Sequence, residues 1–327
     1  MRVTFEEMKD QFQRVLVSVG FSEERAALCA RIFAENSRDG VYSHGLNRFP
    51  VFVQMVRDGH IHVKGEPVCL EQNGAVERWD GQLAPGMYTA TRAMERAIGL
   101  AKTHGLGAVA VRNTNHWMRG GTYGWQAVAA GCIGICATNT IANMPPWGAT
   151  EPRLGNNPLV MAVPRQEGPL VLDMAMSQFS FGKLQEYELK NKTLPVDGGF
   201  DQNGELTKDP AAIRESSRPV PIGYWKGSGL SLMLDVLVAS LSGGRTVAQI
   251  TAEGTEAGVS QFFLCIKADT LDQRISEEII EYARTAQPES EDASVRYPGE
   301  GTLATRRQNE KEGIPVNEEI WQQVLGL

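Results

Sequence analysis

A histidine and an arginine that together could reduce a small oxo acid stand four residues apart near the N-terminus. His44 and Arg48 lie in the stretch YSHGLNRFP, and on an α-helix this spacing puts both side chains on one face. An arginine binds a carboxylate through a bidentate fork, and a protonated histidine donates to a carbonyl oxygen as hydride reaches the carbon. The spacing also fits two unrelated polar residues on an exposed helix, so both interpretations stay open.

A second candidate histidine follows a short apolar strand. Asn113, Asn115 and His116 lie in VRNTNHWMRGG, and loops that follow strands often carry the binding sites of α/β proteins. His116 could hydrogen-bond to a substrate oxygen, or it could pack beside Trp117 in an asparagine-rich turn. The next strand end carries a similar polar set, which fits either a polar pocket or a series of turns: Asn139, Thr140, Trp147, Asn156, Asn157 and Pro158.

A lysine beside a glycine-rich turn is a candidate for binding pyrophosphate. Lys226 stands in YWKGSGLSLML, directly before a predicted helix, and the free N–H groups at a helix start attract phosphate. A loop lysine in a flexible turn is the alternative. Residues 105–110 fit G-x-G-x-x-A, but they precede a strand instead of following one, so the Rossmann context is missing. The sequence therefore opposes a Rossmann domain without opposing a nicotinamide cofactor.

Metal ligation has little support in the sequence. His60 and His62 have no carboxylate or third histidine close by, and Cys132 and Cys136 have the wrong spacing for a zinc ribbon. The chain contains no G-x-S-x-G motif and no P-loop. We expect chemistry that uses no metal.

Composition excludes several classes of partner. The 327 residues carry 39 acidic and 32 basic side chains, a net charge of -7. This charge balance does not favour binding to nucleic acid or to an anionic membrane. No apolar run approaches the roughly 18–20 residues that span a bilayer. The five cysteines are odd in number and three lie in apolar surroundings. We expect reduced, mostly buried thiols in a cytoplasmic protein.

The first 70 residues are predicted to be helical. Thr4 caps a first helix and Ser22 a second. A third begins near Ser43, with Pro50 early enough to bend it. From about Val68 the pattern changes to a hairpin, and helices and strands then alternate, which indicates a layered α/β core. The longest irregular stretch, 194–224, and an apolar, buried-looking helix follow, before a charged, helical C-terminal part.

Six stretches, in order along essentially the whole chain, carry a family resemblance. They are YSHGLNRFP, NTNHWMRGG, the NNP of 156–158, VLDMAMS, YWKGSG and the YPGE of 297–300. With them the sequence resembles the type-2 malate/lactate dehydrogenases, non-Rossmann NAD(P)-dependent reductases of 2-oxo acids. The resemblance implies an α/β fold with a mixed sheet and a homodimer. It also implies a helical segment 1–70, joined in one lobe by 271–327, around an α/β core of 71–270.

The resemblance also implies roles for individual residues. His44 is the expected proton donor, Arg48 and His116 the expected substrate contacts, and Trp147 the expected lining of the pocket. The cofactor is expected along one strand and against two further segments: Pro169, Leu170, Val171, Leu172, Asp173, Met174 and Ala175, then Trp225 and Lys226, then Gly299, Glu300 and Gly301.

The implied reaction is the reduction of a small anionic sugar acid by NADH, with NADPH as the other possible donor. Malate, lactate, ureidoglycolate and sulfolactate are alternative substrates within the same family. A non-catalytic protein that binds small acids on the same scaffold is an alternative of another class. The presence of both His44 and Arg48 opposes it.

Overall fold

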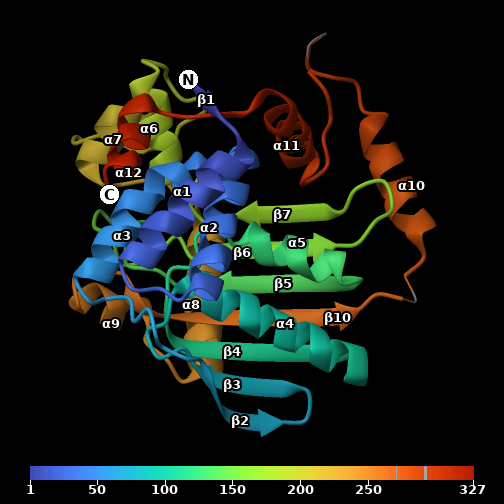
Figure 1. Cartoon of the computed structure of the whole chain (residues 1–327). Helices are drawn as coiled ribbons and strands as arrows, with labels where there is room; N and C mark the ends of the chain where they lie inside the picture. Colours follow the sequence, from blue (N-terminus) through green and yellow to red (C-terminus); the bar gives the residue numbers. More distant parts are fainter. Residues whose placement is uncertain (270, 291–292) are drawn as a thin grey trace.

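A mixed seven-stranded sheet forms the centre of the molecule (Figure 1). The computed structural model describes residues 1–269, 271–290 and 293–327. Strands β3 and β4 pair in parallel, and every other neighbouring pair in this sheet is antiparallel. The expected mixed α/β sheet is therefore confirmed. Its order is β2 (Val68–Asn73), β3 (Val76–Asp80), β4 (Leu106–Asn115), β10 (Ala257–Lys267), β5 (Cys132–Thr138), β6 (Leu159–Val163) and β7 (Leu170–Met174).

Helices cover both faces of the sheet, and alternate residues of β10 show how. Phe263 is buried in one core with side chains of α4 (Gly86–His104) and α5 (Gly121–Ala129). Phe262, which points to the other face because strand side chains alternate, packs against Leu234 and Val238 of α8 (Trp225–Ser242). The sheet is thus the middle layer of three.

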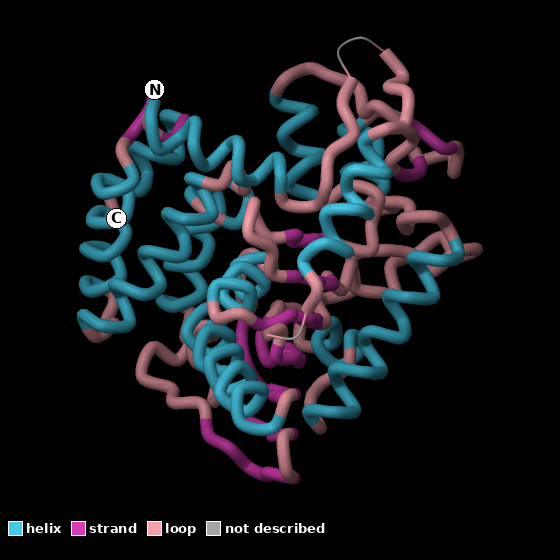
Figure 2. Tube along the Cα trace, turned by 90° about the vertical axis from the view of Figure 1, so that its right-hand side faces the viewer, coloured by secondary structure: helices cyan, strands magenta, loops and turns pink. Residues whose placement is uncertain are grey.

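A helical bundle stands beside the sheet and contains both chain ends (Figure 2). It includes α1 (Phe5–Ser18), α2 (Glu23–Arg38), α3 (Phe49–Arg57) and α12 (Glu318–Leu325), and β1 (Arg2–Val3) pairs with β11 (Ile314–Pro315). Phe12 stacks on Phe49 at 4.2 Å between ring centroids, and Trp321 of α12 is buried in the same core. The exact division into two lobes stays a prediction.

The third helix begins later than predicted. Two 3-10 turns, η1 (Tyr42–His44) and η2 (Leu46–Arg48), precede α3, which starts at Phe49. Pro50 lacks an N–H and fits only in the first turn of an α-helix, so the α-helix cannot extend back through it. The prediction that His44 and Arg48 share an α-helical face is therefore wrong. A different arrangement brings them together.

Several elements were not predicted. The stretch expected to be irregular contains the β8–β9 pair and α7, and α6 precedes it. Asp209 caps α7 and Pro210 occupies its first position, a signal that the sequence did contain. The remaining elements are α6 (Phe181–Leu189), β8 (Gly199–Phe200), β9 (Leu206–Thr207), α7 (Pro210–Ser216), α9 (Val247–Ala252), α10 (Gln273–Arg284) and α11 (Glu300–Glu312).

Helix α8 is apolar but not fully buried, which corrects the sequence-based expectation. Leu232, Met233 and Val236 are each about half exposed, at 51%, 59% and 51%. Composition predicted burial because it cannot distinguish a core helix from a helix with an exposed apolar face. In the described part of the chain, no helix combines the length and the apolarity needed to span a bilayer.

Candidate active site

The turn that carries His44 is fixed to helix α2. The Asn36 side chain donates to the backbone oxygen of His44 at 2.9 Å, and the Leu46 N–H donates to the Ser37 hydroxyl at 2.9 Å. A Cβ at Gly45 would lie 2.2 Å from the Ser37 oxygen, so only glycine allows this close approach. The 3-10 geometry thus comes from packing on α2 and not from helical periodicity.

His116 is held just beyond the end of β4. The buried Asn115 side chain donates to the backbone oxygens of Leu83 and Ala84, at 2.7 and 3.1 Å, which fixes the chain before the histidine. The Met118 N–H donates to His116 Nδ1 at 2.9 Å. Because Nδ1 accepts this bond, the neutral ring carries its proton on Nε2. His116 is therefore prepared to donate a hydrogen bond from Nε2.

The two histidines face each other. The His44 and His116 rings stack with centroids 5.6 Å apart and planes 21° apart. The Ser43 hydroxyl lies 2.9 Å from His44 Nδ1, so protein groups engage Nδ1 of both rings, and no described residue hydrogen-bonds to either Nε2. The structure thus brings together two of the residues that the sequence singled out.

Neutral imidazoles are favoured in this pair in the absence of substrate. Burial, with the positive charges of Arg48 and Arg119, lowers the pKa of His44 to about 4. Burial, with the charges of Arg48 and His44, lowers the pKa of His116 well below its usual value. Both rings are therefore uncharged near neutral pH, and a bound anion would make protonation of either ring easier.

Arg48 is a partly buried cation that forms no ion pair with a described carboxylate, although its charge acts on Glu256. Its charge acts on both histidines, yet none of the ion pairs found among the described residues includes Arg48. The nearby Arg119 differs, because it pairs with the buried Asp39 at 2.7 Å. A free guanidinium beside two uncharged imidazoles is suited to binding the carboxylate of a small acid.

Sequence reasoning missed Glu256, which lies beside His116. Its Oε1 lies 4.0 Å from His116 Nε2, and about 18% of its side chain is exposed. The residue stands in GTEAGVS, between a turn and an apolar strand, and no local pattern singled it out. Only the pairing of β10 with β4 reveals where it lies.

Trp147, Trp225 and Lys226 gather at the start of α8. The Trp147 ring lies 5.0 Å from that of Tyr224, and the backbone N–H of Trp147 donates to the Ser228 hydroxyl at 3.0 Å. The Lys226 amine lies 5.9 Å from the centroid of Trp225, which is 66% exposed. In the described part of the chain, no ring contact or hydrogen bond joins this group to the histidine pair.

The asparagines after β5 have structural partners. Asn139 donates to Asp235 of α8 at 2.8 Å, and Asn157 donates to the Ser231 backbone oxygen at 2.9 Å while accepting from the Thr140 N–H. Both asparagines are fully buried. Of the two interpretations left open, these contacts favour a structural role: the amides attach α8 to the sheet.

The expected cofactor strand and the C-terminal loop lie side by side. Strand β7 is at the edge of the sheet, and the Val171 N–H donates to the Pro298 oxygen at 2.9 Å. Gly299 has φ +96°, and a Cβ there would lie 3.1 Å from the Val171 nitrogen. Asp173 at the other end of β7 accepts from the Gly121 N–H at 2.8 Å. The edge strand is thus attached to α5 and to the loop that begins α11.

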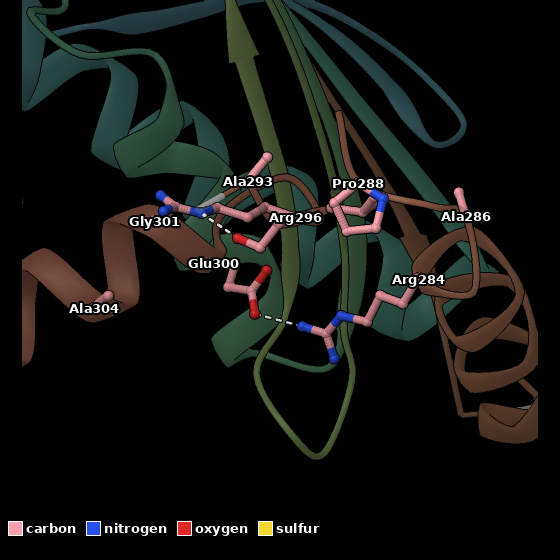
Figure 3. Close-up of a pocket in the computed structure, with 10 residues that line it drawn as sticks. Arg284, Ala286, Pro288, Ala293, Arg296, Glu300, Gly301 and Ala304 are labelled. Carbon is pink, nitrogen blue, oxygen red and sulfur yellow. Dashed lines mark hydrogen bonds and ion pairs between the residues drawn. The ribbon is translucent and has the colours of Figure 1, made fainter. Parts of the chain in front are cut away.

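Two neighbouring cavities flank this strand and loop. One encloses about 590 Å³ beside Glu300 and Gly301, and Figure 3 shows Arg284 extending from α10 to pair with Glu300. The other, also about 590 Å³, is lined largely by apolar side chains, including Leu170 and Leu172 of β7. Apolar walls with a few charged groups suit a dinucleotide, whose rings need apolar surfaces and whose phosphates need cations.

Comparison with known proteins identifies the family of the chain. Residues 3–325 match the sequence profile of the malate/L-lactate dehydrogenases. The chain belongs to the malate/L-lactate dehydrogenase family. It is 47% identical to the 2,3-diketo-L-gulonate reductase of Citrobacter koseri, with all of both chains covered. It is therefore an oxidoreductase of the 2-oxo and 2-hydroxy acid class that works with a nicotinamide cofactor.

Solved structures of this family share the fold. The malate dehydrogenase of Entamoeba histolytica matches with a TM-score of 0.93 at 25% identity, covering 99% of this chain and 96% of that one. The sulfolactate dehydrogenase of Methanocaldococcus jannaschii matches with a TM-score of 0.88 at 29% identity, covering 100% and 98%. The family and the absence of a Rossmann domain, both inferred from the sequence, agree with these matches.

Proposed function

We propose that this enzyme reduces 2,3-diketo-L-gulonate to 3-dehydro-L-gulonate, with His44 as proton donor. The observation that carries the proposal is the stacked His44–His116 pair beside the unpaired Arg48. The full-length relatives at 47% identity, which are named for this reaction, support the choice of substrate. Malate, lactate, ureidoglycolate and sulfolactate remain the alternatives to be tested.

The charges of the site suggest how substrate binding prepares the proton donor. Arg48 would bind the substrate carboxylate through a bidentate pair. This pairing offsets the positive charge that helps to lower the pKa of His44, so the imidazole gains a proton more readily. When bound, a nicotinamide cofactor would supply the hydride that the C2 carbonyl carbon receives. His44 then gives its Nε2 proton to the carbonyl oxygen as the C=O electron pair moves there, and the product is a hydroxyl.

We propose that the cofactor lies along Pro169–Ala175 and contacts Trp225, Lys226 and Gly299–Gly301. The cavities beside β7 and α11 support this placement. We further propose NADH as the preferred donor.

A panel of oxo acids tests the proposed function. Purified enzyme is mixed with NADH or NADPH and with one 2-oxo acid at a time, and the loss of reduced cofactor is followed. The acids are diketogulonate, oxaloacetate, pyruvate and the 2-oxo acids that correspond to ureidoglycolate and sulfolactate. We expect the highest kcat/KM for diketogulonate with NADH. A higher value for any other acid would replace the proposed substrate, and a higher value with NADPH would replace the proposed donor.

We also propose a cytoplasmic homodimer, with α8 at the interface. All five cysteines are free thiols and four are buried, which suits a reducing compartment. The exposed face of α8 is apolar, while its Asp235 is turned inward, accepting from Asn139. An uncharged apolar face can pair with its own copy about a two-fold axis, and such surfaces are rare on monomers.

A charge placed on this face should separate the dimer. We expect Met233→Glu to elute as a monomer, because a carboxylate would be buried without a partner in the paired state. The matched control is Leu70→Glu, a similarly exposed apolar residue on the edge strand β2, which should leave the mass unchanged. Light scattering after gel filtration measures both. A wild-type monomer, or a Met233→Glu dimer, would contradict the proposed interface.

A further inference from the structure

Glu256 is brought to the active site by strand register. Ala257 at the start of β10 pairs with Asn115 at the end of β4 in an antiparallel ladder. The next residue outward on each strand is Glu256 on one side and His116 on the other, so the two side chains are cross-strand neighbours. The ladder shifts register just beyond Ala257, and Gly258 there has φ +70°. The irregular strand end therefore holds a carboxylate beside His116.

This carboxylate is mostly buried, and no described residue donates a hydrogen bond to it. The group that the ion pairs place nearest to it is His116, whose Nε2 is 4.0 Å from Oε1, too far for a direct hydrogen bond. Burial raises the pKa of Glu256 to about 7, against the lowering effect of Arg48. A site that needed only to receive an anionic acid would gain nothing from such a group, because a carboxylate repels another carboxylate.

We propose that Glu256 and His116 together bind a hydroxyl group on the carbon chain of a polyhydroxylated 2-oxo acid. The two atoms are 4.0 Å apart, so a single oxygen can lie about 2.8 Å from each of them. The hydroxyl donates its proton to Glu256 and accepts from the Nε2–H of His116, which is protonated there because Nδ1 accepts from Met118. This inference deepens the proposed function and rests on it.

Other substrate groups fit this pair less well. A methyl group makes neither hydrogen bond, and it leaves the carboxylate without a donor. A second carboxylate accepts from His116 but is repelled by Glu256. Only a group that both donates and accepts satisfies the two side chains at once. Glu256 is thus a specificity-determining residue that favours sugar acids over pyruvate and over dicarboxylates such as oxaloacetate.

Variants of Glu256 test the inference through substrate ratios. Glu256→Gln and Glu256→Ala are compared with wild type on diketogulonate, 2-keto-L-gulonate, pyruvate and oxaloacetate. In Glu256→Ala, we expect the kcat/KM ratio of the best polyhydroxy acid to pyruvate to fall by about 10- to 100-fold, the size of a lost hydrogen bond to a charged group. In Glu256→Gln, which keeps a hydrogen-bond acceptor, the same ratio should fall less. The kcat/KM for oxaloacetate relative to pyruvate should rise, because the repelling charge is gone.

The control is Glu253→Gln, an exposed carboxylate three residues earlier whose ion pair with Arg245 is long, at 3.9 Å. It should keep the wild-type ratios. Thermal unfolding checks each variant, and the nearly isosteric Glu256→Gln carries the test if Glu256→Ala does not fold. Equal losses on all four acids would overturn the inference and assign Glu256 to the positioning of His116.

The panel also separates this inference from the proposed function. Suppose that 2-keto-L-gulonate is a better substrate than diketogulonate and that its kcat/KM ratio to pyruvate depends on Glu256. The proposed substrate is then wrong, and the Glu256 inference holds. If diketogulonate is preferred but its ratio to pyruvate is unchanged in both Glu256 variants, the proposed function holds and the inference fails. If wild type reduces no polyhydroxy acid, both fail.

Discussion

Replacement of His44 by alanine should lower kcat by about 10²- to 10⁴-fold, the usual contribution of a general acid. The loss follows from geometry: Nδ1 of His44 faces the Ser43 hydroxyl at 2.9 Å, and Nε2 is left to protonate the substrate oxygen. Binding of NADH should persist, because the proposed cofactor contacts lie on β7, α8 and the loop before α11. Steady-state rates and a fluorescence titration with NADH measure the two effects.

His104→Ala is the matched control for this experiment. His104 ends α4 and is exposed, so its removal should change neither kcat nor cofactor binding. His116→Ala should mainly raise KM, because His116 is proposed to hold the substrate and not to transfer the proton. A His44→Ala enzyme with wild-type kcat would remove His44 from the reaction, whatever its effect on KM.

Local features of the fold were predictable because short-range interactions determine them. Ser22 accepts from the Arg25 N–H, and Thr4 accepts from the Glu7 N–H, as their positions before apolar helices indicated. The apolar runs of β4, β5 and β10 read as strands for a similar reason, since β-branched and aromatic residues fit a pleated surface. Strand order was not predictable, because β10 lies between β4 and β5, which precede it by more than a hundred residues.

The site was predictable as a set of residue types but not as an arrangement. His44 and Arg48 were chosen for an α-helical spacing that the chain does not adopt. They come together because Gly45 packs on Ser37 and because Pro50 delays α3. Glu256 left no signal at all, because its position depends on the register of two strands that are distant in sequence. Long-range pairing decides such positions, and composition does not contain it.

Substitution of Arg48 should separate its two roles, binding the carboxylate and adjusting the pKa of His44. Arg48→Lys keeps the charge but loses the bidentate fork, so KM should rise by about 10- to 100-fold with a smaller change in kcat. Arg48→Gln loses both, and kcat/KM should fall by about 30- to 3,000-fold, the range for removing one partner of a buried charge pair. An unchanged KM in both variants would show that Arg48 does not bind the carboxylate.

The pH profile distinguishes these variants further. Reduction needs protonated His44, and its pKa is about 4 in the free enzyme, so kcat/KM should fall about tenfold per pH unit as pH rises above that value. Arg48→Gln removes a charge that lowers this pKa, so the falling limb should move to higher pH, whereas Arg48→Lys should leave it in place. Besides Arg48, Arg119 acts on His44 and His116 stacks on it, and Glu256 lies beside His116. Of these, Glu256 titrates near 7.

Glu256→Gln therefore serves as the background for both profiles, because it removes the carboxyl group whose pKa burial raises to about 7. Suppose that, in that background, the fall of kcat/KM with pH shifts with Arg48→Gln and not with Arg48→Lys. That result would assign the titration to His44. If the fall of kcat/KM with pH disappears in the Glu256→Gln single variant, the titrating group is instead the Glu256 carboxylate. In that case His44 would be protonated from another source, and the coupling between carboxylate binding and proton uptake, on which the proposed mechanism rests, would be lost.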